Sequence, residues 1–248
     1  MEGEPGREPY QRRRPRAIPL DATLDPESEE RSVSLAIVDY GAGNLRSVVH
    51  AVEHAGLEAI VTNEPPAILA ARGVILPGVG AAADTMANLH RHRLVEVIKE
   101  VIARGTPFLG VCMGLQALFT SSLEGGEHPC LGIFEGVVRR FPAGLRVPHM
   151  GWNQVRQVQP HPFFDGVPDG AHFYFVHSYY ADPAARGIVA GETDYGVTFP
   201  SVVIYRNVIA TQFHPEKSGA HGLRLYANFG RIVAGELSLP EAPAAVAS

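Results

Sequence analysis

The sequence predicts an α/β fold with a central, mostly parallel sheet flanked by helices and a C-terminal half rich in antiparallel strands. Up to about residue 130, short apolar runs such as Leu35–Val38 alternate with segments whose apolar residues recur at helical spacing, which is typical of β-α units. Beyond that point strand-like runs follow one another closely, and this favours antiparallel pairing.

The N-terminal half begins the series of β-α units. Buried strands are expected at Leu35–Val38, Ala59–Val61, Gly73–Leu76 and Phe108–Val111. Apolar side chains at helical spacing between Leu45 and Ala55, closed by Gly56, predict the first helix. Further helices are predicted at Ala82–Arg104 and Leu115–Ser122.

The C-terminal half is expected to be mostly strands. These are predicted at Gly136–Arg140, His172–Tyr179, Gly187–Glu192, Ser201–Tyr205 and Val208–Gln212. Arg206 and Asn207 form a tight turn between the last two of them. An amphipathic helix over Gly222–Ala234 closes the domain.

Composition indicates a globular chain that does not act on nucleic acid or in a membrane. The net charge is −5, hydrophobic residues make up 46% of the chain, and no apolar stretch approaches the roughly 20 residues that span a bilayer. Two cysteines, Cys112 and Cys130, are too few for a disulfide framework or a cysteine zinc site. We therefore expect a reducing, cytoplasmic setting, with no metal and no cofactor.

The two ends of the chain differ from its middle. Residues 1–32 combine several prolines with eight acidic and six arginine side chains and little apolar periodicity, which predicts a disordered tail. The Ala- and Pro-rich segment 239–248 is interpreted in the same way. A single domain is expected over residues 33–238.

The string "GVCMG" is the strongest chemical feature. Gly110 and Gly114 flank Cys112 at the −2 and +2 positions, where a strand is expected to turn sharply into a helix. Such a turn exposes the thiol beside free helical N–H groups that favour a thiolate and an oxyanion. Considered alone, Cys112 could still be a small buried hydrophobic residue, and Cys130, which lacks this setting, is interpreted as structural.

A base for the thiol is suggested by "ATQFHPEKS". His214 and Glu216 are two residues apart at the end of an apolar run, so an extended backbone directs both side chains to the same side. The carboxylate could then hold the imidazole in one tautomer. Paired with the cysteine about 100 residues upstream, the order Cys, His, Glu favours catalysis over a surface histidine.

Two glycine-rich strings remained ambiguous on the residues alone. "LPGVG", Leu76–Gly80, could direct N–H groups at an oxyanion or could be a plain turn. "YGAGNLR" partly imitates a dinucleotide fingerprint, with Glu64 near the position of a ribose-binding acid, but Arg46 stands at the third glycine position. A structural turn is the favoured interpretation of the second string.

Together the motifs resemble the class I glutamine amidotransferases, whose glutaminase domains carry G-x-C-x-G-x-Q and a later H-P-E. More narrowly, "DYGAGN", "LPGVG", "PHMGWN" and "YFVHSYY" look like the glutaminase subunits of imidazole glycerol phosphate synthase, from about Ala36 to Gly235. The resemblance implies a flavodoxin-like class I glutaminase fold and glutamine hydrolysis in histidine biosynthesis.

The resemblance also implies roles for individual residues. Cys112 would be the nucleophile, His214 the acid and base, and Glu216 its orienting partner. The N–H groups of Val79 and Met113 would form the oxyanion hole. Positions that match those holding the substrate glutamine are Gly80, Gln116, Ser178 and Tyr179.

A partner is implied as well, because ammonia released into water would be wasted and the domain leaves no room for a second catalytic one. In the family the partner is a cyclase with a (β/α)₈ barrel, which forms a heterodimer with the glutaminase. Interface positions of the family match Met150, Trp152, Asn153 and Lys217, the last being one of only two lysines in the chain. The alternatives are the glutaminase subunit of pyridoxal 5'-phosphate synthase and a non-catalytic flavodoxin-like regulatory module.

Overall fold

The computed structural model describes residues 34–41 and 45–240. The predicted tail over residues 1–32 and all but two residues of the predicted tail over 239–248 lie outside the described residues. The same holds for residues 42–44, which form the middle of the "YGAGNLR" turn.

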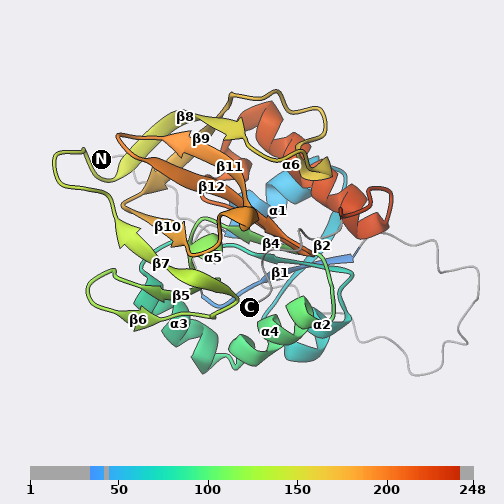
Figure 1. Ribbon diagram of the computed structural model, residues 1–248. Coiled ribbons are helices and arrows are strands. Elements are labelled where there is room, and N and C mark those ends of the chain that lie inside the picture. The colour runs from blue at the N-terminus through green and yellow to red at the C-terminus, as the bar shows by residue number, and fades with distance from the viewer. Residues whose placement is uncertain (1–33, 42–44, 241–248) are drawn as a thin grey trace, which may run out of the picture. The chain divides into compact units, whose positions relative to one another are not determined.

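A nine-stranded sheet forms the centre of the domain (Figure 1). Its strand order is β2-β1-β3-β4-β13-β12-β11-β8-β9, and the first five strands are parallel to one another. These parallel strands are β1 (Ser34–Val38), β2 (Glu58–Thr62), β3 (Gly73–Leu76), β4 (Phe108–Val111) and β13 (Val208–Thr211). The parallel sheet expected from the N-terminal half is therefore present, with β13 contributed from the far end of the chain.

The remaining strands of this sheet are antiparallel, as the C-terminal half predicted. They are β12 (Thr198–Tyr205), β11 (Val189–Asp194), β8 (His149–Gln157) and β9 (Ala171–His177). A second, four-stranded sheet has the order β10-β7-β5-β6, in which only β5 and β7 run parallel. Its strands are β5 (Phe119–Ser122), β6 (His128–Pro129), β7 (Phe134–Arg140) and β10 (Tyr179–Pro183).

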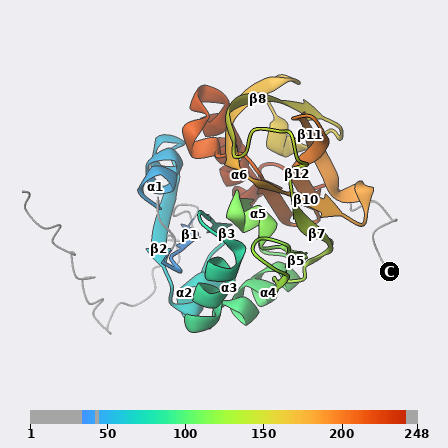
Figure 2. The same cartoon turned by 90° about the vertical axis from the view of Figure 1, so that its left-hand side faces the viewer.

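Helices cover both faces of the large sheet. In Figures 1 and 2, α1 and α6 lie on one side of the parallel strands and α2, α3 and α4 on the other. Their bounds are α1 (Leu45–His54), α2 (Pro65–Ala70), α3 (Ala82–Arg91), α4 (Leu94–Ala103) and α6 (Gly219–Ala234). The short elements are α5 (Met113–Gln116), η2 (Pro162–Phe164), η3 (Arg186–Ile188) and η4 (Pro215–Lys217).

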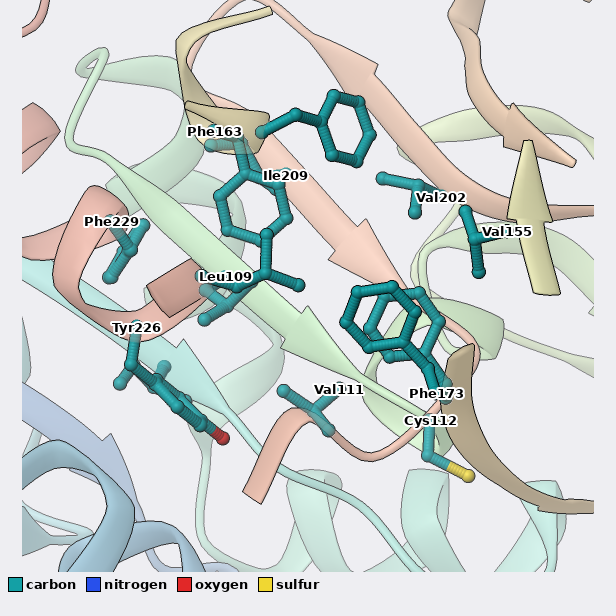
Figure 3. Packing of buried hydrophobic residues seen from close by; sticks show 14 of the residues in the cluster. Leu109, Val111, Cys112, Val155, Phe163, Phe173, Val202, Ile209, Tyr226 and Phe229 are labelled. Atoms are coloured by element: carbon teal, nitrogen blue, oxygen red, sulfur yellow. The ribbon is translucent and has the colours of Figure 1, made fainter. Parts of the chain in front are cut away.

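Two hydrophobic cores lie on the opposite faces of the sheet, and the alternation of strand residues separates them. In β4, Leu109 and Val111 join the core under α1 and α6, whereas Phe108 joins the core under α2, α3 and α4. Figure 3 shows the first core, with Cys112 at its margin just beyond Val111. Because burying an aliphatic side chain contributes about 1.5–3 kcal/mol, these cores rather than helix propensity stabilise the short strands.

Two helix predictions were wrong in part. The helix expected over Ala82–Arg104 is two helices, because Arg93 adopts a left-handed conformation with a φ of 57° between α3 and α4. The helix expected over Leu115–Ser122 ends after Gln116, and Phe119–Ser122 is strand β5. Pairing with β7 decides this, since a four-residue segment carries too little periodicity to distinguish the two structures.

Other differences concern strand boundaries. The single strand predicted over His172–Tyr179 is β9 and β10, which separate at Ser178 because they belong to different sheets. The strand predicted from Gly187 begins at Val189, after η3. Three helices and strands escaped prediction: α2, which starts with two prolines, the two-residue strand β6, and β8, whose sequence "HMGWNQVRQ" is largely polar.

Candidate active site

Cys112 occupies a strained turn between β4 and α5. Its backbone has a φ of 54° and a ψ of −104°, a conformation that side-chain-bearing residues rarely adopt. A Cβ atom on Gly110 would lie 2.8 Å from the carbonyl oxygen of Gly114, and one on Gly114 would lie 2.0 Å from that of Leu76. The two glycines are therefore required by close backbone packing, as the motif predicted.

Hydrogen bonds hold this turn on the sheet. The N–H of Cys112 donates to the carbonyl of Thr211 on β13 over 2.7 Å, and the carbonyl of Cys112 accepts from the N–H of Gln116 over 3.2 Å. The N–H groups of Met113 and Gly114 open the helical turn, so they have no acceptor within it. They are available to a negative charge beside the thiol.

His214 and Glu216 form a buried pair at the carboxyl end of β13. The Nδ1 atom of His214 lies 2.7 Å from Oε1 of Glu216, and each side chain is only 2% exposed. The backbone of His214 is fixed on both sides, by donation from its N–H to the carbonyl of Tyr174 and by the Ser218 hydroxyl, which donates to its carbonyl.

The charges around His214 decide its protonation. Burial by itself would lower the pKa of His214, but the charge of the adjacent Cys112 and the hydrogen-bonded Glu216 carboxylate together raise the pKa to about 10. His214 is therefore a cation at neutral pH. The imidazole beside the sulfur thus carries a proton that it can donate.

A cavity of about 280 Å³ lies over the thiol. Every residue predicted for catalysis, the oxyanion hole or substrate binding lines it, with the exception of Glu216, which lies behind His214. The residues lining the cavity are Val79, Gly80, Cys112, Met113, Gln116, Glu124, Pro148, Val176, His177, Ser178, Tyr179, His214 and Lys217.

The predicted oxyanion loop lies directly against the cysteine turn. A Cβ atom on Gly78 would be 2.6 Å from the Cβ of Met113, so the two segments are in backbone contact. The buried hydroxyl of Tyr40 donates to the carbonyl of Pro77 over 2.9 Å and anchors the start of the loop. Val79 is 36% exposed at the mouth of the cavity.

The amide of Gln116 is held by two acceptors. Its Nε2 atom donates to the carbonyl of Tyr179 and to Oε1 of Gln212, both over 2.9 Å. The Nε2 atom of Gln212 in turn lies 3.8 Å from the sulfur of Cys112. Gln212 thus connects the predicted substrate residue with the predicted nucleophile. Sequence reasoning missed it, although a glutamine in the apolar run before "HPE" was a detectable sign.

Three of the predicted interface residues lie on one exposed surface near the cavity. Met150 and Trp152 on β8 are 62% and 56% exposed. Nζ of Lys217 lies 5.9 Å from the ring centre of Tyr174, which in turn contacts the ring of Trp152. The fourth, Asn153, is directed inward, where its amide donates to the carbonyl of Asp194 and lies 3.2 Å from Nε2 of His149.

A second pair of buried histidines adjoins the cavity and was not expected. Nδ1 of His149 lies 3.0 Å from Nε2 of His177, and Nδ1 of His177 lies 2.8 Å from the carbonyl of Tyr179. Burial lowers the pKa of His149 to about 4. Burial, together with the charges of His149 and His214, lowers that of His177 to about 3 despite its hydrogen bond to Tyr179. Both rings are therefore neutral at pH 7.

The other cysteine has a different environment. Burial raises the pKa of Cys130 to about 11, so its thiol stays protonated at neutral pH.

No helix within residues 34–41 and 45–240 is long and apolar enough to cross a bilayer.

Comparison with known proteins decides the family. The family model of glutamine amidotransferase class-I matches residues 36–232. This chain belongs to the class I glutamine amidotransferases.

Three relatives share the name imidazole glycerol phosphate synthase subunit HisH. The relative from Dehalococcoides mccartyi (strain CBDB1) is 55% identical over 202 residues, which are 82% of this chain and 98% of the relative. The relative from Chloroflexus aurantiacus is 53% identical, over 79% of this chain and 95% of its own length. The one from Moorella thermoacetica is 52% identical, over 80% and 95%.

Solved structures agree on the amidotransferase fold. A crystal structure of a glutamine amidotransferase superposes with a TM-score of 0.65 at 21% identity, over 81% of this chain and 98% of the other. The structure of PurLQS from Thermotoga maritima gives a TM-score of 0.66 at 18% identity, over 82% and 100%. The predicted fold class is thereby confirmed.

Proposed function

We propose that this amidotransferase is the glutaminase subunit of an imidazole glycerol phosphate synthase. It hydrolyses glutamine to glutamate and ammonia and passes the ammonia to a cyclase subunit for histidine biosynthesis. The observation that carries the proposal is that a thiol and a cationic imidazole, the latter held by a buried carboxylate, face one small cavity in a chain more than half identical to subunits of that name.

The chemistry starts with the thiolate. Cys112 attacks the side-chain carboxamide carbon of glutamine, and the carbonyl oxygen becomes an oxyanion. The N–H of Met113, joined by that of Val79 after a rearrangement of its loop, donates to this oxyanion. In the tetrahedral intermediate that forms, the protonated imidazole of His214 is the nearest proton donor.

His214 then serves as acid and as base. Its Nε2 proton goes to the departing nitrogen, so ammonia leaves and a thioester remains on Cys112. The neutral imidazole next removes a proton from water, which attacks the thioester and releases glutamate and the thiolate. Glu216 keeps His214 oriented through Nδ1 in both steps, because that atom is occupied by the carboxylate.

Substrate recognition falls to four other residues that line the cavity. Gly80, Gln116, Ser178 and Tyr179 line the cavity and offer amide, hydroxyl and backbone groups suited to the amino-acid end of glutamine. Gln116 is pre-oriented by Tyr179 and Gln212, so its position requires little ordering when substrate binds.

The partner is proposed to be a cyclase with a (β/α)₈ barrel fold, forming a heterodimer with this chain. Met150, Trp152 and Lys217 would form the contact surface, with Asn153 supporting it from β8. Exposed Met and Trp side chains are typical of a docking surface rather than of free solvent contact. Lys217 also lines the cavity, so a partner bound there would cover the cavity on that side.

The test is a coupled glutaminase assay. Glutamate release should be low for the purified chain alone and should rise when a cyclase subunit with bound nucleotide ligand is added, while Cys112→Ala should release none. For comparison, the synthase subunit of pyridoxal 5'-phosphate synthase is added in place of the cyclase. Stimulation by that subunit and not by the cyclase would overturn the proposal, and so would full activity of Cys112→Ala.

The docking surface has its own test. Trp152→Ala should weaken binding to the cyclase about tenfold or more, measured by titration calorimetry, because a buried tryptophan is a frequent centre of interface energy. Ile60→Ala is the matched control, since Ile60 is 50% exposed on the opposite edge strand β2. Equal binding by both variants would exclude β8 as the interface.

A further inference from the structure

Helix α6 packs directly on the turn that carries His214 and Glu216. A Cβ atom on Gly222 would lie only 1.9 Å from the carbonyl oxygen of Pro215, so the helix backbone touches that turn. Residues four apart lie on the same face of a helix. Tyr226 is therefore one turn beyond Gly222 on the face directed at η4, and it is fully buried.

Tyr226 and Glu216 each carry a buried polar atom without a matched partner. Oε1 of Glu216 is engaged by His214, but Oε2 of Glu216 and the hydroxyl of Tyr226 are both buried and reach full hydrogen-bond geometry with no group in residues 34–41 and 45–240. Leaving a buried donor or acceptor unpaired costs as much free energy as a lost hydrogen bond. One atom is a donor and the other an acceptor, so they can satisfy each other.

The electrostatics agree with this placement of the two groups. Burial raises the pKa of Tyr226 well above its usual value, and the charge of the Glu216 carboxylate raises it further. The phenol therefore stays protonated and can only donate to the carboxylate. In Figure 3 its ring lies among the buried apolar side chains, with the hydroxyl oxygen at the margin of the core.

We propose that Tyr226 is a positioning residue of the glutaminase site, whose hydroxyl donates to Oε2 of Glu216 and so aims Oε1 at His214. The inference rests on the proposed function and extends the relay by one member, in the order Cys112, His214, Glu216, Tyr226. A carboxylate held at both oxygens cannot rotate away from the imidazole. Because the carboxylate also accepts a hydrogen bond from the phenol, it holds the proton on His214 less strongly.

Other charged groups also face Glu216, but their effects can be distinguished from that of Tyr226. His214 and Lys217 belong to the same turn, and Arg46, His50 and His54 of α1 line a hollow that reaches Glu216. Those three α1 side chains are exposed, so solvent screens their charges. The Tyr226 hydroxyl acts from the buried side, where screening is weak.

The experiment compares Tyr226→Phe with Tyr205→Phe in the complex with the cyclase. The first removes only the hydroxyl at Glu216, and the second removes a hydroxyl at the other end of β13, where Tyr205 pairs with Val208. For Tyr226→Phe, kcat should fall about tenfold with KM for glutamine unchanged, because the interaction lost is a hydrogen bond to a charged group. Tyr205→Phe should match the wild type.

The decisive readout is the titration of His214, followed by its ring nitrogen resonances and assigned with His214→Gln. In Tyr226→Phe the proton should be lost at a pH higher by about half a unit, because the carboxylate loses a competing donor and binds the imidazolium more tightly. When Glu216→Gln is already present, adding Tyr226→Phe should change neither kcat nor the pH at which His214 loses its proton. An unchanged His214 titration in Tyr226→Phe overturns the inference, whatever happens to kcat.

This readout separates the inference from the proposed function. If the wild-type complex releases no glutamate, the proposed function fails, but the His214 titration still reports whether Tyr226 touches Glu216. If the Tyr226 hydroxyl merely fills the core and makes no hydrogen bond, the melting temperature should also respond differently. Tyr226→Phe would then melt at the same or a higher temperature, whereas loss of a hydrogen bond to Glu216 lowers the melting temperature.

Discussion

Two buried histidines near the cavity, His214 and His177, have opposite protonation behaviour. Both are nearly excluded from solvent, at 2% and 6% exposure. The pKa of His214 is raised to about 10 and that of His177 is lowered to about 3. The difference lies in their surroundings, since His214 contacts a carboxylate and is influenced by the charge of Cys112, whereas His177 contacts a second imidazole and a carbonyl.

The comparison teaches that burial alone does not mark a catalytic histidine. Without an anion beside it, a buried imidazole is neutral and serves as a fixed hydrogen-bonding group. His177 has this role, because it holds the carbonyl of Tyr179, which also accepts from Gln116. His214 is a cation because two acidic groups flank it, and only such a cation can protonate a leaving group and stabilise a thiolate.

The largest expected effect comes from removing the thiol. Cys112→Ala should lower glutaminase activity in the complex by about 10⁴-fold or more, since no nucleophile remains. It should also lower the pKa of His214, because the thiol is the largest influence that raises it. Glutamate release and the histidine titration measure the two effects. Cys130→Ser is the control and should leave both unchanged, so loss of activity in that variant would contradict the assignment of the nucleophile.

Neutralising the carboxylate should have the next largest effect. Glu216→Gln removes the negative charge at 2.7 Å from Nδ1 of His214 and should reduce kcat about 10⁴-fold, comparable to neutralising the carboxylate in other triads. The pKa of His214 should fall toward its ordinary value. A pH profile of glutamate release would show this, and a profile identical to that of the wild type would remove Glu216 from the relay.

Acid should destabilise the fold, because His149 and His177 are neutral in the folded protein. The pKa values of His149 and His177 are about 4 and 3 in the folded protein and near 6.5 when unfolded, so the unfolded chain binds more protons as pH falls below 6.5. Their contribution to stability is complete above pH 6.5 and is lost toward pH 3–4, and at pH 5 the loss is about 2 kcal/mol for each histidine, or about 4 kcal/mol for the pair. Urea unfolding at pH 7 and pH 5 measures it. A His149→Gln, His177→Gln double variant should lose this dependence.

The smallest expected effect concerns substrate binding. His177→Gln removes the ring that holds the Tyr179 carbonyl and should raise KM for glutamine about threefold while leaving kcat nearly unchanged, because Gln116 becomes less well oriented. Steady-state kinetics of the complex would separate the two constants. A large fall in kcat instead would mean that His177 takes part in the chemistry, and the contrast with His214 would not hold.

Much of the site could be predicted because its residues act through local patterns. The glycines around Cys112 and the spacing of His214 and Glu216 each indicate a geometry within a few residues, and the structure adopts both. The helix predicted over Leu115–Ser122 was wrong for the opposite reason, since pairing of Phe119 with Phe134 on another strand overrides a short local pattern. The same applies to β8, whose polar sequence is a strand because β9 and β11 flank it.

The sequence by itself determined the order of the β-α units, the strained turn at Cys112 and the family to which the chain is similar. These depend on hydrophobic periodicity and on residues close together in the chain. Only the tertiary structure decided which buried groups meet: Gln212 with Cys112, and His149 with His177. The sign of each histidine's pKa shift follows from such contacts, because charge and desolvation act through space and not along the chain.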